Sequence, residues 1–122
     1  MRVVIVGGGI AAVYLANNLK KYNASLDVMV LSDEKYPPYD RIHLCRLLDD
    51  SEDYKGIGLA LDPTVKLELS QNIKTIDKAH KRVFSQDSMY SYDKLIIATG
   101  SIPISLLDVD TLSNVSVFRS VA

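Results

Sequence analysis

Apolar residues are arranged in two different patterns along this chain, and each pattern predicts a different element. Val3–Val6 is a continuous β-branched run, typical of a strand that is buried on both faces of a parallel sheet. From Ala12 to Leu19, apolar residues recur at i, i+3, i+4 and i+7, the spacing of one helix face. A second apolar run over Leu26–Leu31 predicts another strand. The first thirty residues are therefore predicted to form a βαβ unit.

The rest of the chain predicts mainly loops and short strands. Residues 32–63 are polar and contain tyrosine and proline, which favours loops with a short helix near 44–48. Val65–Leu69 alternates like a half-exposed strand, and the fully apolar run Leu95–Ala98 predicts a central strand. A small antiparallel meander is predicted over 73–76, 82–85 and 89–91. The expected fold class is α/β.

Three glycines separate the first strand from the helix. Gly7 permits the backbone torsions of a tight turn, and Gly9 lets the main chain approach a pyrophosphate without an intervening side chain. The free amides and partial positive charge of the helix start favour phosphate. Ala12 replaces the third glycine of the dinucleotide fingerprint, where close helix–strand packing is the requirement. The loop therefore predicts a site for a dinucleotide.

An acidic pair follows the second strand. Asp33 comes after Gly9 at a spacing close to the roughly 20 residues expected for a ribose-binding carboxylate. Glu34 lies beside it. On its own the pair would be read as surface acids at the start of a loop, but together with the glycine loop and the helix it favours ribose binding.

The amino-acid composition excludes some classes of protein but does not identify the function. The 14 basic and 15 acidic residues are nearly balanced, so no nucleic-acid or membrane surface is predicted. A single cysteine, Cys45, excludes an intrachain disulfide and fits a reducing compartment. No apolar run is long enough to span a bilayer, and the glycines of the N-terminal run favour a strand and turn over a signal peptide. His43 and His80 lack partners at metal-binding spacing, so no metal site is predicted. We expect a cytoplasmic protein.

Two further segments carry a family resemblance. They are Pro38–Leu44, with the sequence PYDRIHL, and Tyr92–Pro103, with the sequence YDKLIIATGSIP. With the glycine loop, they resemble the N-terminal part of the FAD-dependent pyridine nucleotide-disulfide oxidoreductases, over nearly the whole chain. The resemblance is nearest to the branch that holds rubredoxin reductases and the large subunit of nitrite reductase. It implies a Rossmann-like FAD-binding domain that is incomplete, because the NADH domain, the C-terminal FAD segment and the interface domain are not in residues 1–122.

The resemblance also implies roles for individual residues. Arg41 would place a guanidinium fork on the dinucleotide, and Arg119 would be directed toward FAD. Arg46 stands where many relatives have a lysine near the flavin, and Ile73 would contact adenine through its backbone. Any of these arginines taken alone would be a solvated surface charge. The implied FAD-binding residues are Gly7, Gly8, Gly9, Ile10, Ala11, Ala12, Asp33, Glu34, Arg41, Arg46, Ile73, Ala98, Thr99, Gly100 and Arg119.

The activity that the resemblance implies is electron transfer from NADH through flavin to an acceptor. The flavin would supply the chemistry, and no side chain is expected to act as an acid, base or nucleophile. A redox role for Cys45 is the less favoured alternative to a simple replacement of serine. Without the remaining parts, the isolated chain is expected to bind FAD weakly and to be inactive. The acceptor, the choice between NADH and NADPH, and homodimer formation stay open.

Two other classes of function are compatible with the glycine loop. One is a non-enzymatic nucleotide-binding module, which would retain adenosine nucleotides without flavin. The other is an NAD-binding fragment of a small dehydrogenase. The segments around Arg41 and Thr99 argue against the second class, because a simple NAD domain does not need them.

Overall fold

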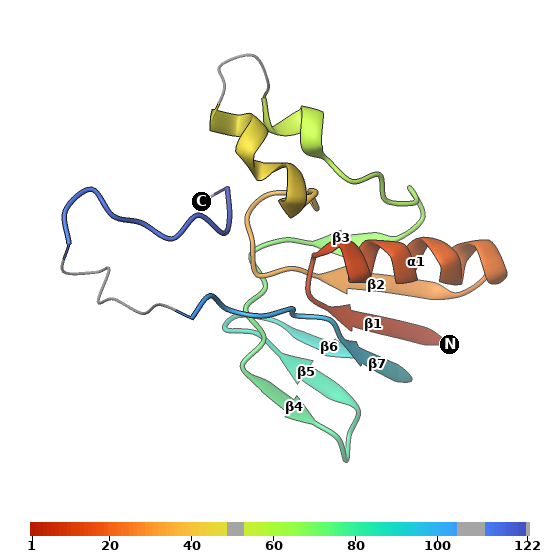
Figure 1. The fold of residues 1–122 in the computed structure, drawn as a ribbon. Helices are drawn as coiled ribbons and strands as arrows, with labels where there is room; N and C mark the ends of the chain where they lie inside the picture. The colour runs from red at the N-terminus through yellow and green to blue at the C-terminus, as the bar shows by residue number, and fades with distance from the viewer. Residues whose placement is uncertain (49–52, 105–111, 122) are drawn as a thin grey trace.

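Four parallel strands form the central sheet, in the order β3-β2-β1-β7 (Figure 1). The computed structural model describes residues 1–48, 53–104 and 112–121. Within them, β1 lies in the middle of the sheet, between β2 and β7. The strands of this sheet are β1 (Arg2–Val6), β2 (Asp27–Leu31), β3 (Lys66–Glu68) and β7 (Lys94–Ile97).

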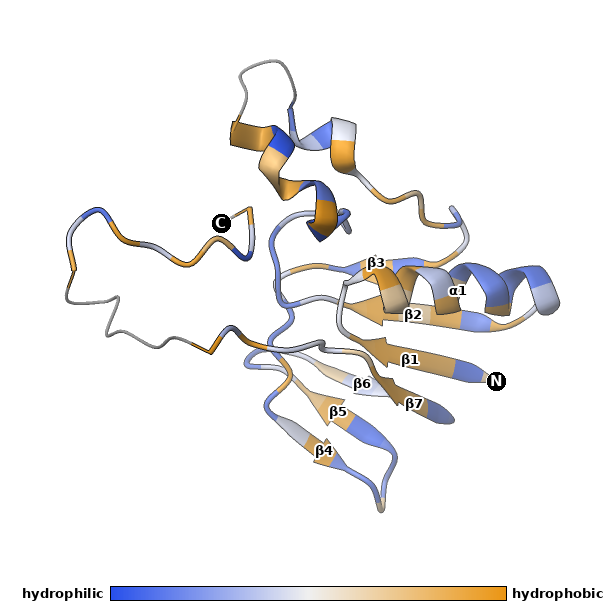
Figure 2. Cartoon of the chain, in the orientation of Figure 1, coloured by the Kyte–Doolittle hydropathy of each residue, from blue (hydrophilic) through white to orange (hydrophobic). Residues whose placement is uncertain are grey.

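One face of the sheet is covered by helix α1 (Ile10–Tyr22), which connects β1 to β2. Ala12 and Ala16 are fully buried and pack in one cluster with Val3 and Ile5. Figure 2 shows the apolar strands beneath the helix and the polar end of α1 away from the glycine loop. The predicted βαβ unit is confirmed, and its small alanines allow the helix to pack closely on the strand.

The opposite face is covered by a three-stranded antiparallel sheet. Its fully buried Val83 packs in one cluster with Val4, Val6 and Leu31. Alternate residues of β1 thus pack on opposite faces of the sheet, which confirms the prediction of a strand buried on both sides. The strands of this predicted meander are β4 (Thr75–Asp77), β5 (Arg82–Phe84) and β6 (Met89–Ser91).

The prediction that Leu95–Ala98 forms a central strand is wrong. In the described part of the chain β7 pairs only with β1 and forms an edge of the sheet. Leu95 packs toward the meander, whereas Ile96 and Ala98 pack toward the cluster under α1. Ile97 is 56% exposed. The apolar composition of the strand therefore reflects cover on both faces rather than a hydrogen-bonded neighbour on both sides.

Two 3₁₀ helices form a smaller lobe beyond the carboxyl ends of the strands. They are η1 (Arg41–Leu48) and η2 (Tyr54–Ile57). The short helix predicted near 44–48 is present, but it begins earlier, and η2 was not predicted. Tyr39, Leu44 and Ile57 form the buried core of this lobe, and Val121 from the C-terminal segment packs against it.

Candidate functional site

The glycine loop leaves β1 in a conformation that only glycine adopts readily. Gly7 has φ of +117°, and its amide donates to the carbonyl of Leu31 at 2.8 Å. A Cβ atom added to Gly7 would lie 2.2 Å from the carbonyl oxygen of Ala98, and one added to Gly8 would lie 2.4 Å from the Ser32 hydroxyl. Gly9 differs from both, because an added Cβ would have no neighbour within 4 Å. The loop is therefore packed against the protein at Gly7 and Gly8 and open at Gly9.

Helix α1 begins at the open end of this loop. Gly9 occupies the N-cap position, no side chain caps the helix, and its first turn holds no acidic residue. The first four amides of a helix have no partner inside the helix, and they carry the positive end of its dipole. Lys20 and Lys21 stabilise the opposite end. This helix start therefore offers N–H donors and a positive potential to an anion.

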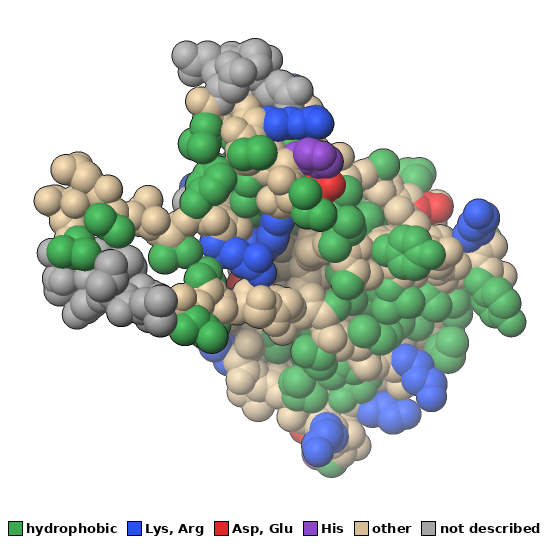
Figure 3. All heavy atoms as spheres, in the orientation of Figure 1, with side chains coloured by type: hydrophobic (Ala, Val, Ile, Leu, Met, Phe, Trp, Pro, Cys, Tyr) green, Lys and Arg blue, Asp and Glu red, His purple; other side chains and the backbone are tan. Residues whose placement is uncertain are grey.

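A cavity of about 350 Å³ lies in front of the glycine loop. This volume falls within the range of small-molecule sites, which run from about 300 to 1,000 Å³. The cavity is at the carboxyl ends of β1 and β7, the usual position for ligands of open α/β sheets. Figure 3 shows Lys and Arg side chains at the hollow between the C-terminal segment and the main body. The residues that line the cavity are Gly7, Gly8, Gly9, Ile10, Ala11, Asp33, Arg41, Ala98, Thr99, Gly100, Ser101 and Arg119.

A second, smaller cavity of about 80 Å³ adjoins the first. The two share Gly7, Asp33 and Thr99 among their lining residues. Ile73 lines the smaller cavity together with Gln71, whose Nε2 donates to the carbonyl of Leu69 at 3.3 Å. Gln71 Oε1 is buried and has no hydrogen-bond partner. The predicted residue Ile73 thus lies beside the main cavity and next to an acceptor that the protein leaves unsatisfied.

A charged network stands at the wall of the main cavity. Arg41 forms an ion pair with Glu34, and its second guanidinium nitrogen donates to the carbonyl of Arg119 at 2.9 Å. The Tyr39 hydroxyl donates to the other Glu34 oxygen at 2.6 Å. Burial of the phenol and its hydrogen bond to Glu34 raise the pKa of Tyr39 to about 12. The network therefore holds a neutral tyrosine and a paired carboxylate behind a cavity-lining arginine.

Arg119 comes from the far end of the chain and reaches the same cavity. Its guanidinium donates to the carbonyl of Ser101 at 3.0 Å and contacts the Ser101 hydroxyl at 3.4 Å. Gly100 precedes this serine with φ of +73°, and an added Cβ there would lie 4.0 Å from the Arg119 guanidinium. The turn after β7 therefore brings Ser101 to the point where Arg119 contacts it.

Some predicted site residues do not line either cavity. Ala12 is buried under the helix, where it provides the close packing expected at its position. Glu34 is turned toward Arg41 and Tyr39, while Arg46 and Cys45 are exposed on η1. Of the lining residues outside the strands, three were not predicted. Their only sequence signal was adjacency to predicted ones: Gln71 and Asn72 precede Ile73, and Ser101 follows Gly100.

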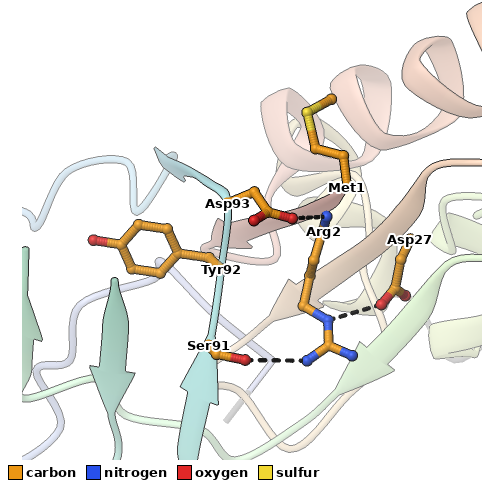
Figure 4. A pocket seen from close by; sticks show the side chains of 6 residues that line it. All are labelled: Met1, Arg2, Asp27, Ser91, Tyr92 and Asp93. Atoms are coloured by element: carbon orange, nitrogen blue, oxygen red, sulfur yellow. Dashed lines mark hydrogen bonds and ion pairs between the residues drawn. The ribbon is translucent and has the colours of Figure 1, made fainter. Parts of the chain in front are cut away.

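Another pocket, of about 330 Å³, lies at the amino ends of the strands (Figure 4). Its charged side chains are engaged: the Arg2 guanidinium donates to Asp27 at 2.7 Å, and the Asp93 carboxylate accepts from the backbone amide of Arg2 at 2.6 Å. Hydrogen bonds from Lys66 and then Arg2 lower the pKa of Asp27 below its usual value. These contacts link the ends of neighbouring strands and engage the charged side chains of the pocket, so we assign no ligand to it.

In residues 1–48, 53–104 and 112–121, no group of three or more His, Cys, Asp or Glu side chains is placed to hold a metal ion. Over the same ranges, α1 and the shorter helices are not long and apolar enough to span a bilayer.

Residues 1–121 match the family described as pyridine nucleotide-disulphide oxidoreductase. The probable ferredoxin reductase CtmF of Castellaniella defragrans is 37% identical over 84% of the chain, and the nitrite reductase [NAD(P)H] of Bacillus subtilis is 30% identical over 86%. The crystal structure of Fdr9 superposes on 87% of the chain with a TM-score of 0.77 and 32% identity.

The matched proteins are much longer than this chain. It spans 27% of the length of CtmF, 14% of the nitrite reductase and 28% of the Fdr9 chain. The family match over residues 1–121 spans the glycine loop, both 3₁₀ helices and the strands of the two sheets.

Proposed function

We propose that this chain, which belongs to the pyridine nucleotide-disulphide oxidoreductases, binds FAD through the cavity at its glycine loop. Members of the family are FAD-dependent enzymes that use NAD(P)H. Here the residues of the cavity fit the adenosine diphosphate half of that cofactor. The observation that carries the proposal is the open face of Gly9 at the uncapped start of α1.

The pyrophosphate would be held by the main chain of Gly8 and Gly9 and the first amides of α1. These groups are free of side-chain caps, and no acidic residue of the first helical turn opposes a phosphate. Arg41 and Arg119 line the same cavity and offer guanidinium donors to a phosphate. Since charged hydrogen bonds are stronger than neutral ones, the two arginines would contribute to both affinity and orientation.

The adenosine would be held on the other side of the loop. Asp33 is exposed and lines both cavities, so its carboxylate is available to accept hydrogen bonds from ribose hydroxyls. Ile73 and Gln71 lie in the smaller cavity that continues from Asp33. A ligand with an N–H group there would supply the partner that Gln71 Oε1 lacks, because a buried acceptor without a partner is unfavourable.

Bound FAD would supply the redox chemistry, taking a hydride from NAD(P)H and delivering electrons to an acceptor. The residues of this chain would bind and orient it. Among the described residues that line the main cavity, none is a histidine, cysteine or lysine. Asp33, Arg41 and Arg119 are its charged members, and each is assigned to binding.

For the whole protein we propose an NAD(P)H-dependent flavoprotein oxidoreductase, of which residues 1–122 form the first part of the FAD-binding domain. The name of CtmF, a probable ferredoxin reductase, supports a small electron-carrier protein as the acceptor. A cytoplasmic location belongs to the same proposal, and it is supported by the free thiol of Cys45.

Equilibrium dialysis with FAD, ADP and FMN tests the binding proposal. FAD and ADP share the diphosphate and adenosine that the cavity fits, so each should bind saturably and displace the other. FMN lacks adenosine and should bind far more weakly. Retention of FMN as tight as that of FAD, or the failure of both FAD and ADP to bind, would contradict the proposal.

A further inference from the structure

We propose that Glu34 and Tyr39 are positioning residues, which set Arg41 against the cavity and hold residues 119–121 beside it. They would act through Arg41 and the C-terminal segment without contacting the ligand themselves. The part of this inference that concerns ligand affinity rests on the proposed function, whereas the part that concerns the C-terminal segment does not.

Glu34 has both carboxylate oxygens engaged by protein donors. One oxygen pairs with Arg41, and the other accepts from the Tyr39 hydroxyl at 2.6 Å. The side chain is partly buried and is not among the lining residues of either cavity. Asp33, its neighbour, is exposed and lines both cavities. The two adjacent acids therefore have separate roles: Asp33 faces the ligand space, and Glu34 neutralises and orients Arg41.

Arg41 is held from three directions. Its Nη2 pairs with Glu34, its Nη1 donates to the carbonyl of Arg119 at 2.9 Å, and its guanidinium lies 5.5 Å from the centre of the Tyr39 ring. The planar guanidinium makes such simultaneous contacts in a fixed geometry, which lysine does not. With these contacts in place, Arg41 keeps one orientation at the cavity wall before any ligand binds, and less side-chain entropy is lost on binding.

Tyr39 extends the network to the C-terminal segment. Tyr39 is 4% exposed. Its hydroxyl oxygen accepts a hydrogen bond from the amide of Val121 at 3.2 Å, and the same hydroxyl donates a hydrogen bond to Glu34. The side chain of Val121 packs on the cluster formed by Tyr39, Leu44 and Ile57.

Residues 112–118, which lead into this segment, are all exposed. The position of the segment therefore depends on the contacts at residues 119–121. Two of those contacts pass through the network, from Arg41 to the carbonyl of Arg119 and from the amide of Val121 to Tyr39.

The substitution Glu34→Gln distinguishes a positioning role from a purely electrostatic one, because the two roles predict opposite changes in the affinity for ADP. Glu34 adds a negative charge close to a cavity that is proposed to hold a diphosphate. If its charge acted only at a distance, its removal would raise the affinity for ADP. If Glu34 positions Arg41, its removal lowers that affinity, because Arg41 loses its fixed orientation and its hold on Arg119.

The experiment uses the full chain and compares Glu34→Gln and Tyr39→Phe with Tyr54→Phe as the matched control. Tyr54 belongs to the same lobe, with its ring 5.6 Å from that of Tyr39, but its hydroxyl donates to the carbonyl of Pro37. Two quantities are measured. One is the affinity for ADP by calorimetry, and the other is the rate at which trypsin cleaves the Arg119–Ser120 bond, with cleavage after Arg82 in β5 as the reference for the folded body.

We expect Glu34→Gln and Tyr39→Phe to weaken ADP binding about three- to tenfold, the range of one or two lost hydrogen bonds. Both should also accelerate cleavage after Arg119 without accelerating cleavage after Arg82, while Tyr54→Phe changes neither quantity. The Tyr39→Phe variant removes a single oxygen atom and keeps the buried ring, so it tests the inference even if Glu34→Gln is unstable.

The two proposals fail in different ways. If the wild-type chain does not bind ADP, the proposed function fails, and the cleavage rates still test the docking of residues 119–121. If the wild type binds ADP and Glu34→Gln binds it equally well or more tightly, the positioning role is overturned. The same holds if both variants leave the cleavage rate after Arg119 unchanged.

Discussion

At the scale of single residues, Gly7 and Gly9 stand two positions apart and meet opposite requirements. Gly7 needs a positive φ and has no room for a Cβ beside Ala98, whereas the space beside Gly9 is open. Gly7→Ala should therefore destabilise the fold by roughly 1–3 kcal/mol through backbone strain alone, and by more through the clash. Gly9→Ala should change stability by about 1 kcal/mol or less but weaken the binding of FAD and ADP. Urea unfolding combined with dialysis checks both substitutions, and equal nucleotide binding by Gly9→Ala and the wild type would contradict the role given to Gly9.

The buried phenol of Tyr39 predicts a stability change at high pH. Its pKa is raised from the usual 10.0 to about 12, so the folded state favours the neutral form. This contribution is fully present below about pH 10 and is lost as the pH rises toward 12. Ultraviolet titration of tyrosinate should show a late-ionising tyrosine that disappears in Tyr39→Phe. Tyr54→Phe is the comparison, because burial also raises the pKa of Tyr54. A normal ionisation for Tyr39 would show that its hydroxyl is not held by Glu34.

The roles of these residues differ in how far the sequence reveals them. The glycines and Asp33 belong to a local pattern, in which a strand, a turn and a helix fix the spacing, so their place at the cavity was predicted. The pairing of Glu34 with Arg41 joins a loop residue to the first residue of η1, and no periodicity indicates that these two side chains meet. The contact of Arg41 with Arg119 spans 78 positions, and it depends on tertiary structure alone.

At the scale of elements, β1 holds the domain together because both of its faces and both of its edges are covered. Ile5 is fully buried and lies opposite Val30 on β2 and Ile96 on β7. Ile5→Ala should cost about 2–5 kcal/mol of unfolding free energy, since it removes core volume that neighbouring strands do not refill. Ile76→Ala on β4, where the side chain is 40% exposed, should cost much less. Equal losses for the two substitutions in urea unfolding would contradict the assignment of the core.

The predicted elements were reliable where hydrophobic periodicity is strong and less so elsewhere. The strand β1, helix α1 and the meander follow from their patterns. β7 was wrongly predicted to be a central strand because its residues are all apolar. A fully apolar run indicates that both faces of a strand are buried, and the meander and the cluster under α1 bury them here. It does not indicate whether another strand pairs with each edge. The helix η2 was missed because a single 3₁₀ turn over Tyr54–Ile57 is too short to produce a period.

At the scale of the whole molecule, the cavity lies at one end of the parallel sheet, and a cluster of hydrogen-bonded charged residues lies at the other end. The carboxyl ends of the strands carry the glycine loop, Asp33 and the residues after β7, and the 3₁₀ lobe with residues 119–121 forms the remaining wall. The amino ends are tied by Arg2, Asp27 and Asp93. The order of elements predicts this polarity, but the remaining wall follows only from how the 3₁₀ lobe and residues 119–121 pack together.

An amide-resolved NMR titration of the chain with FAD tests the proposed binding site most directly. We predict saturable shifts for the amides of Gly8–Ala12, for Asp33 and for Thr99–Ser101, and none for Arg2, Asp27 or Asp93 in the other pocket. The proposed binding site would be contradicted by shifts centred on Arg2, Asp27 and Asp93, or by a glycine loop whose resonances stay unchanged at saturating FAD.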